Sequence, residues 1–351
     1  MIKRLLPLLV VLALVAAACG NDGDGADGGD RQAVGEGAPK AQAACDDVAF
    51  DGGTANIVYM PPGTEFPYYI AIGEGIEMKA EELDVETSMQ APQSGADIEG
   101  QMGMIQDVLT RGADGIILST HDEQAAAPLV EQAVNEGVAV VIVNSDIADF
   151  PTPVHGVVGY KQRDGTKKIG DYAIELVDGE AKIGLIEGLP GYHSTERVGG
   201  FTDAIEGEGG MDVQESLVGD WNTEGGNRAG QDMLQGNEEI DMIFAANDYM
   251  AIGANKAAQS LNREVLILGN DGDTQALEEI HAGDWQATVM THPVEMGETV
   301  LEVMVDCLNK ELGDFFTEIP TTVVDQENAI DYLCEPEKLH PKPSKDYSDE
   351  C

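Results

Sequence analysis

Polar and aromatic side chains follow almost every predicted β-strand of this 351-residue chain. The segments that follow predicted strands are residues 66–69, 144–146, 191–197, 220–222, 247–248, 270–273 and 291–292. One polar residue at one strand end is ordinary, but recurrence at nearly every strand end is a signal. Because the carboxyl ends of parallel strands meet at one edge of a sheet, we expect these side chains to surround a crevice.

The residue types in these segments suit a molecule that carries several hydroxyl groups. Asn247 and Asp271 offer donors and acceptors that can bind neighbouring hydroxyls. Arg197 adds a planar fork of donors, and tyrosine or tryptophan rings can cover the C–H face of a sugar ring. A hydrogen bond between a carboxylate and a neutral hydroxyl contributes about 1.5–3 kcal/mol net. The pattern therefore predicts a site for a neutral sugar or polyol.

The elements that carry these segments alternate between strand and helix. Strands are expected at 56–60, 84–90, 115–119 and 138–143, with helices at 68–83, 98–111 and 125–135 between them. The run at 138–143 is apolar throughout, as in a parallel sheet covered on both faces. A second series follows, with strands at 182–187, 213–218, 242–245, 265–268 and 285–290 and helices at 168–177, 197–206, 229–234, 250–261 and 274–281. Two such series predict an α/β protein with two doubly wound parallel-sheet lobes.

Four stretches carry a more specific resemblance. They are residues 106–118, 197–201, 243–253 and 268–272, and the Asn-Asp-x-Met-Ala-x-Gly stretch at 247–253 is the most specific. Together they resemble the type I periplasmic sugar-binding proteins, of the ribose- and galactose-binding type, which are the substrate-binding components of ABC transporters. The resemblance runs from about Ala55 to Tyr332. It implies two lobes that are joined by three hinge crossings and close around a ligand.

The resemblance also assigns roles to individual residues. Tyr68 and Tyr69 fall where the ribose type has two ring-stacking aromatics, and Trp221 matches a third. Arg197 matches the sugar-binding arginine, and Asn247 and Asp271 match a hydroxyl-binding pair. The full set of expected ligand-binding residues is Phe66, Tyr68, Tyr69, Asn144, Asp146, Arg197, Trp221, Asn247, Asp271 and Thr291.

Three positions depart from the ribose type. Asn144-Ser145-Asp146 replaces an Asp-Arg pair, Thr291 replaces a glutamine, and Phe66 stands where asparagine is expected. These changes argue against plain ribose as the ligand. Several simpler explanations stay open: the two tyrosines could only pack between the lobes, Trp221 could be core, and Asn144, Asp146 and Asp271 could be turn residues.

The N-terminus predicts a lipoprotein. Lys3 and Arg4 precede an apolar stretch, and Ala16-Ala17-Ala18-Cys19 ends it, so residues 1–18 are expected to be a signal peptide and Cys19 the lipidated residue. An ordinary secretory signal cut after Ala18 is the alternative. Residues 19–52 are expected to form a flexible linker, because 20–37 is rich in Gly and Asp. The N-terminal lobe is placed at 53–158 and 292–319, the C-terminal lobe at 159–291 and 320–337, and a tail at 338–351.

Four cysteines remain if Cys19 carries lipid, and an even number fits disulfides in an oxidising compartment. Three pairings are possible, and we favour Cys307 with Cys334 and Cys45 with Cys351. No CxxC motif occurs and His is not clustered with Cys, so neither a metal nor another cofactor is expected.

Charge and motifs exclude other classes of function. Lys and Arg number 19 and Asp and Glu 65, so the net charge of −46 disfavours a nucleic acid partner and a sugar-sensing repressor. No Ser/His/Asp set, zinc spacing or phosphate loop indicates an enzyme. The sequence thus predicts a monomeric extracytoplasmic binding protein, anchored by lipid to the outer face of the cytoplasmic membrane, that delivers a neutral monosaccharide, polyol or cyclitol to an ABC permease. A furanosyl signal molecule or nucleoside as ligand, or delivery to a membrane sensor, is the alternative.

Overall fold

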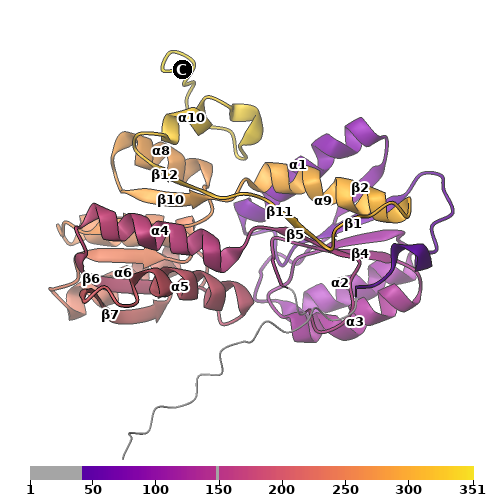
Figure 1. Ribbon diagram of the computed structural model, residues 1–351, viewed down its shortest axis with the longest axis horizontal. Coiled ribbons are helices and arrows are strands. Elements are labelled where there is room, and N and C mark those ends of the chain that lie inside the picture. The colour runs from indigo at the N-terminus through magenta and orange to yellow at the C-terminus, as the bar shows by residue number, and fades with distance from the viewer. Residues whose placement is uncertain (1–41, 148–149) are drawn as a thin grey trace, which may run out of the picture. The chain divides into compact units, whose positions relative to one another are not determined.

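The N-terminal sheet is parallel and has six strands in the order β11-β5-β4-β3-β1-β2. The structure is a computed structural model that describes residues 42–147 and 150–351 (Figure 1). The strands of the N-terminal sheet are Asn56–Met60 (β1), Glu86–Met89 (β2), Gly115–Leu118 (β3), Ala139–Val143 (β4), Gly156–Gly159 (β5) and Phe316–Glu318 (β11).

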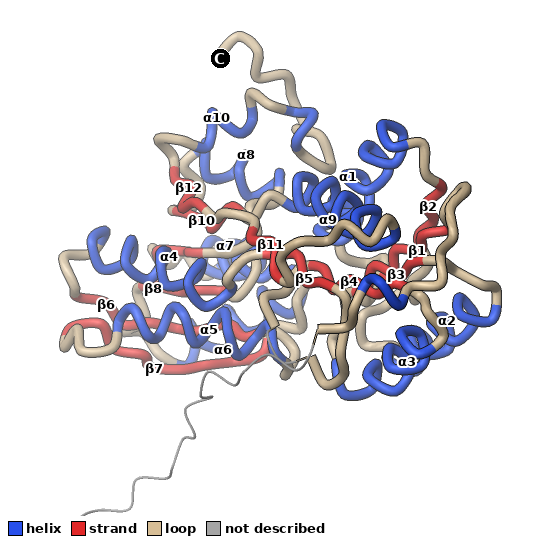
Figure 2. Tube along the Cα trace, turned by 45° about the vertical axis from the view of Figure 1, so that its right-hand side comes forward, coloured by secondary structure: helices blue, strands red, loops and turns tan. Residues whose placement is uncertain are grey.

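Helices cover both faces of this sheet. Successive residues of a strand point to opposite faces, so neighbouring residues of β1 pack against different helices. Ile57 and Tyr59 of β1 pack in the cluster that contains α1 (Pro67–Leu83) and α9 (Pro293–Leu308). Val58 and Met60 pack on the other side, against α2 (Ile98–Thr110) and α3 (Glu123–Asn135). Figure 2 shows these helices on either side of the strands.

The C-terminal sheet has the order β12-β10-β9-β8-β6-β7, and β12 runs antiparallel to β10 while the other pairs are parallel. Its strands are Glu180–Glu187 (β6), Gly210–Val218 (β7), Met242–Ala245 (β8), Leu266–Leu268 (β9), Ala287–Met290 (β10) and Thr322–Asp325 (β12). Its helices are Gln162–Leu176 (α4), Tyr192–Ile205 (α5), Thr223–Gly236 (α6), Asp248–Ser260 (α7), Thr274–Ala282 (α8) and Ala329–Leu333 (α10).

Within residues 42–147 and 150–351, the chain passes between the two sheets three times. The crossings are residues 160–161 between β5 and α4, 291–292 between β10 and α9, and 319–321 between β11 and β12. The predicted fold of two doubly wound lobes with a three-crossing hinge is confirmed. Each lobe takes strands from distant parts of the sequence, so the lobes cannot be separated by a single cut of the chain.

Both predicted disulfide pairings are wrong, although all four cysteines are disulfide-bonded. Cys45 pairs with Cys307, and Cys334 pairs with Cys351. Cys307 lies in α9 of the N-terminal lobe, whereas Cys334 follows α10, which packs against α8 of the C-terminal lobe. The predicted pairs would therefore each have had to join the two lobes.

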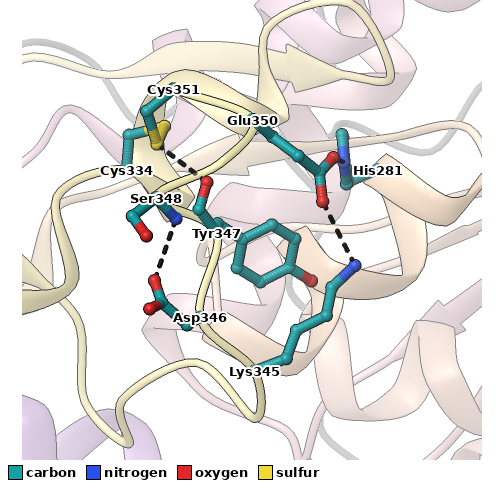
Figure 3. Close-up of a disulfide and its surroundings, with 8 residues drawn as sticks. All are labelled: His281, Cys334, Lys345, Asp346, Tyr347, Ser348, Glu350 and Cys351. Atoms are coloured by element: carbon teal, nitrogen blue, oxygen red, sulfur yellow. Dashed lines mark hydrogen bonds and ion pairs between the residues drawn. A yellow bond between two sulfur atoms is a disulfide. The ribbon is translucent and has the colours of Figure 1, made fainter.

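The segments that precede and follow the two lobes in the sequence are packed against them. Cys45–Asp47 forms a short 3₁₀ helix (η1), and Ala43 and Val48 are buried, so part of the expected 19–52 linker belongs to the N-terminal lobe. At the other end, Tyr347 of the expected tail is buried, and Glu350 lies 2.9 Å from His281 at the end of α8 (Figure 3). The Cys334–Cys351 bridge closes this tail onto the lobe.

The predicted signal peptide and Cys19 lie outside the described residues. In the described part of the chain, no helix combines the length and the apolar character that a membrane span requires.

Candidate functional site

A cleft lies where residues from both lobes meet at the carboxyl ends of the strands. It contains about 380 Å³ of empty space, its open mouth included. Eight of the ten predicted residues line it: Phe66, Tyr68, Tyr69, Asn144, Arg197, Trp221, Asn247 and Asp271.

The polar side of the cleft is built on a buried ion pair. Arg197 Nη1 lies 2.9 Å from Asp271 Oδ1, and each side chain is 4% exposed. Arg197 also donates from Nη1 to the Ala246 carbonyl at 3.0 Å and from Nε to Gln162 Oε1 at 3.1 Å. Burial works against the charged form of Arg197, but Asp271 holds the pKa of the guanidinium above its ordinary value. Both groups are thus charged at neutral pH, and the pair is electrically neutral as a unit.

Trp221 covers the guanidinium of this pair. Its ring lies 5.4 Å from Arg197 Cζ, a cation–π distance. Asp220 and Trp221 both have left-handed backbone conformations, with φ of 56° and 60°, which is costly for residues other than glycine. Asn247 Nδ2 donates to the Trp221 carbonyl at 3.2 Å. The turn after β7 therefore holds the indole against the cleft at some cost in backbone energy.

Asn247 also has a structural role as the N-cap residue of α7. Its Oδ1 accepts a hydrogen bond from the Met250 backbone N–H at 2.9 Å and so caps the N-terminus of α7. Asp248, the next residue, is buried; its Oδ2 accepts bonds from the backbone N–H groups of Gly272 and Asp273 at 2.8 Å each. The segment after β8 thus fixes the loop that carries Asp271.

The opposite side of the cleft is aromatic. Tyr68 and Tyr69 lie in the first turn of α1, which begins at Pro67 and has Phe66 as its N-cap residue. The Tyr68 hydroxyl lies 2.9 Å from Thr291 Oγ1 and donates to Asn144 Oδ1 at 3.2 Å, and Asn144 Nδ2 donates to the Tyr69 hydroxyl at 3.3 Å. Asn144 therefore orients both tyrosines, in addition to lining the cleft.

Two predicted residues do not line the cleft. Thr291 lies behind Tyr68, where its hydroxyl also donates to the Asp271 carbonyl at 2.9 Å. Asp146 is directed to the C-terminal lobe instead: Oδ1 accepts from the Tyr192 hydroxyl at 2.9 Å and Oδ2 from the Gln162 backbone N–H at 3.2 Å. Both are positioned to support other residues rather than to face the empty space.

Three lining residues were not predicted, namely His121, His193 and Tyr249. Burial lowers the pKa of both histidines, which are therefore neutral at neutral pH. His121 Nδ1 lies 3.2 Å from the Gly95 carbonyl, and His193 Nδ1 lies 2.7 Å from Gln162 Nε2. A signal for His121 was present, because it follows strand β3 as the other candidates follow their strands.

Three buried carboxyl groups belong to the polar side of the cleft, namely Asp271 itself, Asp248 and Asp273. Burial raises the pKa of Asp271 to about 6 and that of Asp248 to about 7, and it raises the pKa of Asp273 well above the ordinary value. Among the described residues, no group of His, Cys, Asp or Glu has the arrangement needed to hold a metal ion.

A family model described as a periplasmic binding protein domain matches residues 57–312. The ribose import binding protein of Bacillus subtilis is 28% identical over 244 residues, which cover 69% of this chain and 78% of that protein. The D-allose-binding periplasmic protein of Escherichia coli is 27% identical over 249 residues, covering 68% of this chain and 80% of that protein.

Solved structures share the fold. An ABC transporter solute binding protein from Mycobacterium smegmatis with bound glycerol has a TM-score of 0.74 and 25% identity, and the match covers 79% of this chain and 96% of that chain. The Caulobacter myo-inositol binding protein has a TM-score of 0.74 and 24% identity, covering 80% and 96%. These matches extend over both lobes.

Proposed function

The chain belongs to the periplasmic binding protein family, and from this premise we propose that it is the extracytoplasmic substrate-binding protein of an ABC importer. It captures a neutral monosaccharide, polyol or cyclitol between its two lobes. The buried Arg197–Asp271 pair in the cleft carries the proposal, because it offers ionised donors and acceptors to hydroxyl groups. The tyrosines on the opposite side offer rings and fixed hydroxyls to the same ligand.

The charge of the cleft favours a neutral ligand over an ion. Among the described residues that line it, Arg197 and Asp271 are the charged ones, and their charges compensate each other. An anionic or cationic ligand would bring an unpaired charge into a partly desolvated site, which costs free energy. The names of the relatives point to the same class, since they include ribose- and allose-binding proteins.

We further propose that the protein works as a lipoprotein on the outer face of the cytoplasmic membrane. Lys3, Arg4 and the apolar stretch that ends at Cys19 support this proposal. One or more acyl chains on Cys19 would hold the lobes near a permease without a membrane span.

A thermal-shift screen tests the proposed ligand class. The panel contains D-ribose, D-allose, myo-inositol, glycerol, adenosine and D-glucuronate. A ligand that binds only the folded protein raises the melting temperature, because at about 100 times its dissociation constant it adds about 2.7 kcal/mol. We expect the largest shift from a neutral sugar or cyclitol. A larger shift from glucuronate would contradict the neutral class, and one from adenosine would move the ligand to nucleosides.

A further inference from the structure

Asp146 reaches from the N-terminal lobe to two groups of the C-terminal lobe. It lies three residues after β4, yet Oδ1 accepts a hydrogen bond from the Tyr192 hydroxyl at 2.9 Å. Its Oδ2 accepts from the backbone N–H of Gln162, the first residue of α4, at 3.2 Å. A carboxylate at a helix N-terminus is stabilised by the free N–H groups and the helix dipole. The carboxylate is therefore held in place by α4 while it binds Tyr192.

Tyr192 belongs to the C-terminal lobe, whereas Asp146 follows a strand of the N-terminal sheet. It is the first residue of α5 and lines a small hollow beside the cleft with His121, His193 and Trp221. Neither Asp146 nor Tyr192 lines the cleft itself. Their contact is thus a direct bond between lobes at the edge of the site.

The contact can exist only when the lobes are together. Gln162 directly follows a hinge crossing and can stay near Asp146 as the lobes rotate, whereas Tyr192 lies 30 residues further along the chain, in α5. In the open form, water would take the place of Tyr192 at the Asp146 carboxylate and of Asp146 at the Tyr192 hydroxyl. The bond therefore favours the closed form by its net value, whatever the ligand.

We propose that Asp146 and Tyr192 form a clasp that holds the closed lobes together and sets how fast the ligand leaves. They are positioning residues, since they act through the lobes and do not touch the ligand. Removing the Tyr192 hydroxyl should lower the ratio of closed to open protein about 3- to 10-fold, the range for a net hydrogen bond at a partly exposed site.

The first measurement needs no ligand. Spin labels are attached through Glu136→Cys at the end of α3 and Glu206→Cys at the end of α5, both exposed, in a chain that also carries Cys19→Ser. Double electron–electron resonance then gives the closed fraction with and without Tyr192→Phe. We expect a smaller closed fraction in the variant. Equal fractions in the two proteins, zero included, would overturn the clasp.

Tyr172→Phe is the matched control. Tyr172 is on α4, and its hydroxyl faces the carboxylate of Asp325 in β12, within the C-terminal lobe. The control loses the same hydroxyl next to the same type of partner, but no contact between lobes. Its closed fraction should equal that of the wild type, and a loss as large as that in Tyr192→Phe would also overturn the clasp.

The second measurement rests on the proposed function. Stopped-flow binding of D-ribose, D-allose and myo-inositol should show a dissociation rate about 3- to 10-fold higher in Tyr192→Phe, with an unchanged association rate and an unchanged melting temperature without ligand. Asp146→Ala should give a similar rate, and the double variant should be no worse than Asp146→Ala alone. If the wild type binds none of the three compounds, the proposed function fails, and the first measurement still decides the clasp. If the wild type binds one of them and the dissociation rates of the wild type and the variant are equal, the clasp fails and the proposed function stands.

Discussion

At the scale of single residues, the polar side of the cleft depends on Arg197 and Asp271 together. Each group is buried, and a buried charge without a partner is far more costly than a buried pair. Gln162, which is fully buried, ties the pair to both lobes: it accepts from Arg197 and donates to the Asn144 carbonyl at 3.0 Å. A change at Asp271 should therefore affect both ligand affinity and folding.

Asp271→Ala should cost about 2–4 kcal/mol of ligand affinity, because hydroxyls of the ligand and Arg197 lose their acceptor. It should also lower the free energy of unfolding by about 3–5 kcal/mol, because Arg197 is left buried and unpaired. Calorimetric titration and urea unfolding measure the two effects. Asp203→Ala, which breaks a half-exposed pair with Arg163, is the control and should cost less than about 1 kcal/mol. An unchanged unfolding energy in Asp271→Ala would contradict the buried pair.

Asp248 should make stability depend on pH. Its pKa is raised to about 7 by burial, against about 3.9 in an unfolded chain, so the folded state binds more protons between these values. The stabilisation from this group is present at low pH and is lost as pH rises through about 7. Relative to Asp248→Asn, the wild type should gain about 1–2 kcal/mol between about pH 8 and about pH 5.5. Urea unfolding of both proteins across this range checks it, and parallel curves would contradict it.

At the scale of elements, the alternation of strand and helix predicted most of both lobes. The apolar run at 138–143 became the fully buried β4, and the helix expected at 274–281 became α8. The short β5 and the long α9 were not foreseen, and α4 begins at Gln162 rather than at 168. β5 has only four residues, and its two glycines hide the strand pattern.

The sequence predicted which strand ends surround the cleft, but it did not predict the direction of every side chain at those strand ends. Asn144 has a left-handed backbone conformation, with φ of 60°, and the loop beyond it directs Asp146 to α4 and α5 instead of the cleft. The pairing of the cysteines could likewise not be predicted, because spacing along the chain does not reveal that η1 lies at the end of α9. Both outcomes depend on tertiary contacts.

The two disulfides should differ in their contribution to stability. Cys45–Cys307 spans 262 residues and Cys334–Cys351 spans 17. If loop-closure entropy dominates, replacing both cysteines of the long-range bridge by serine should lower the unfolding free energy by about 5 kcal/mol, against about 3 kcal/mol for the short-range bridge. Urea unfolding of the two double variants tests the order. A larger loss for Cys334→Ser with Cys351→Ser would show that packing of the tail on α8 outweighs the entropy term.

At the scale of the whole molecule, the proposed lipid anchor decides where the lobes work. Cys19→Ser removes the thiol that would be acylated, so the protein should leave the membrane fraction and appear in the soluble extracytoplasmic fraction. Cell fractionation with antibody detection measures this. Ala18→Gly is the control, because it keeps a small residue before Cys19 and should leave the protein in the membrane fraction. Full membrane retention of Cys19→Ser would contradict the anchor.

The net charge of −46 lowers the stability of the folded state, because folding brings 65 acidic residues into a smaller volume, where their like charges repel one another. Added salt shortens the screening length from about 30 Å at about 0.01 M to about 3 Å at about 1 M and so weakens this repulsion. The melting temperature should therefore rise steadily with KCl over that range. Choline chloride should give a rise of similar size, because screening depends on ionic strength and not on a particular cation. A rise with KCl alone would point to specific potassium binding, and no rise with either salt would show that the surface carboxylates are too far apart for their repulsion to limit stability.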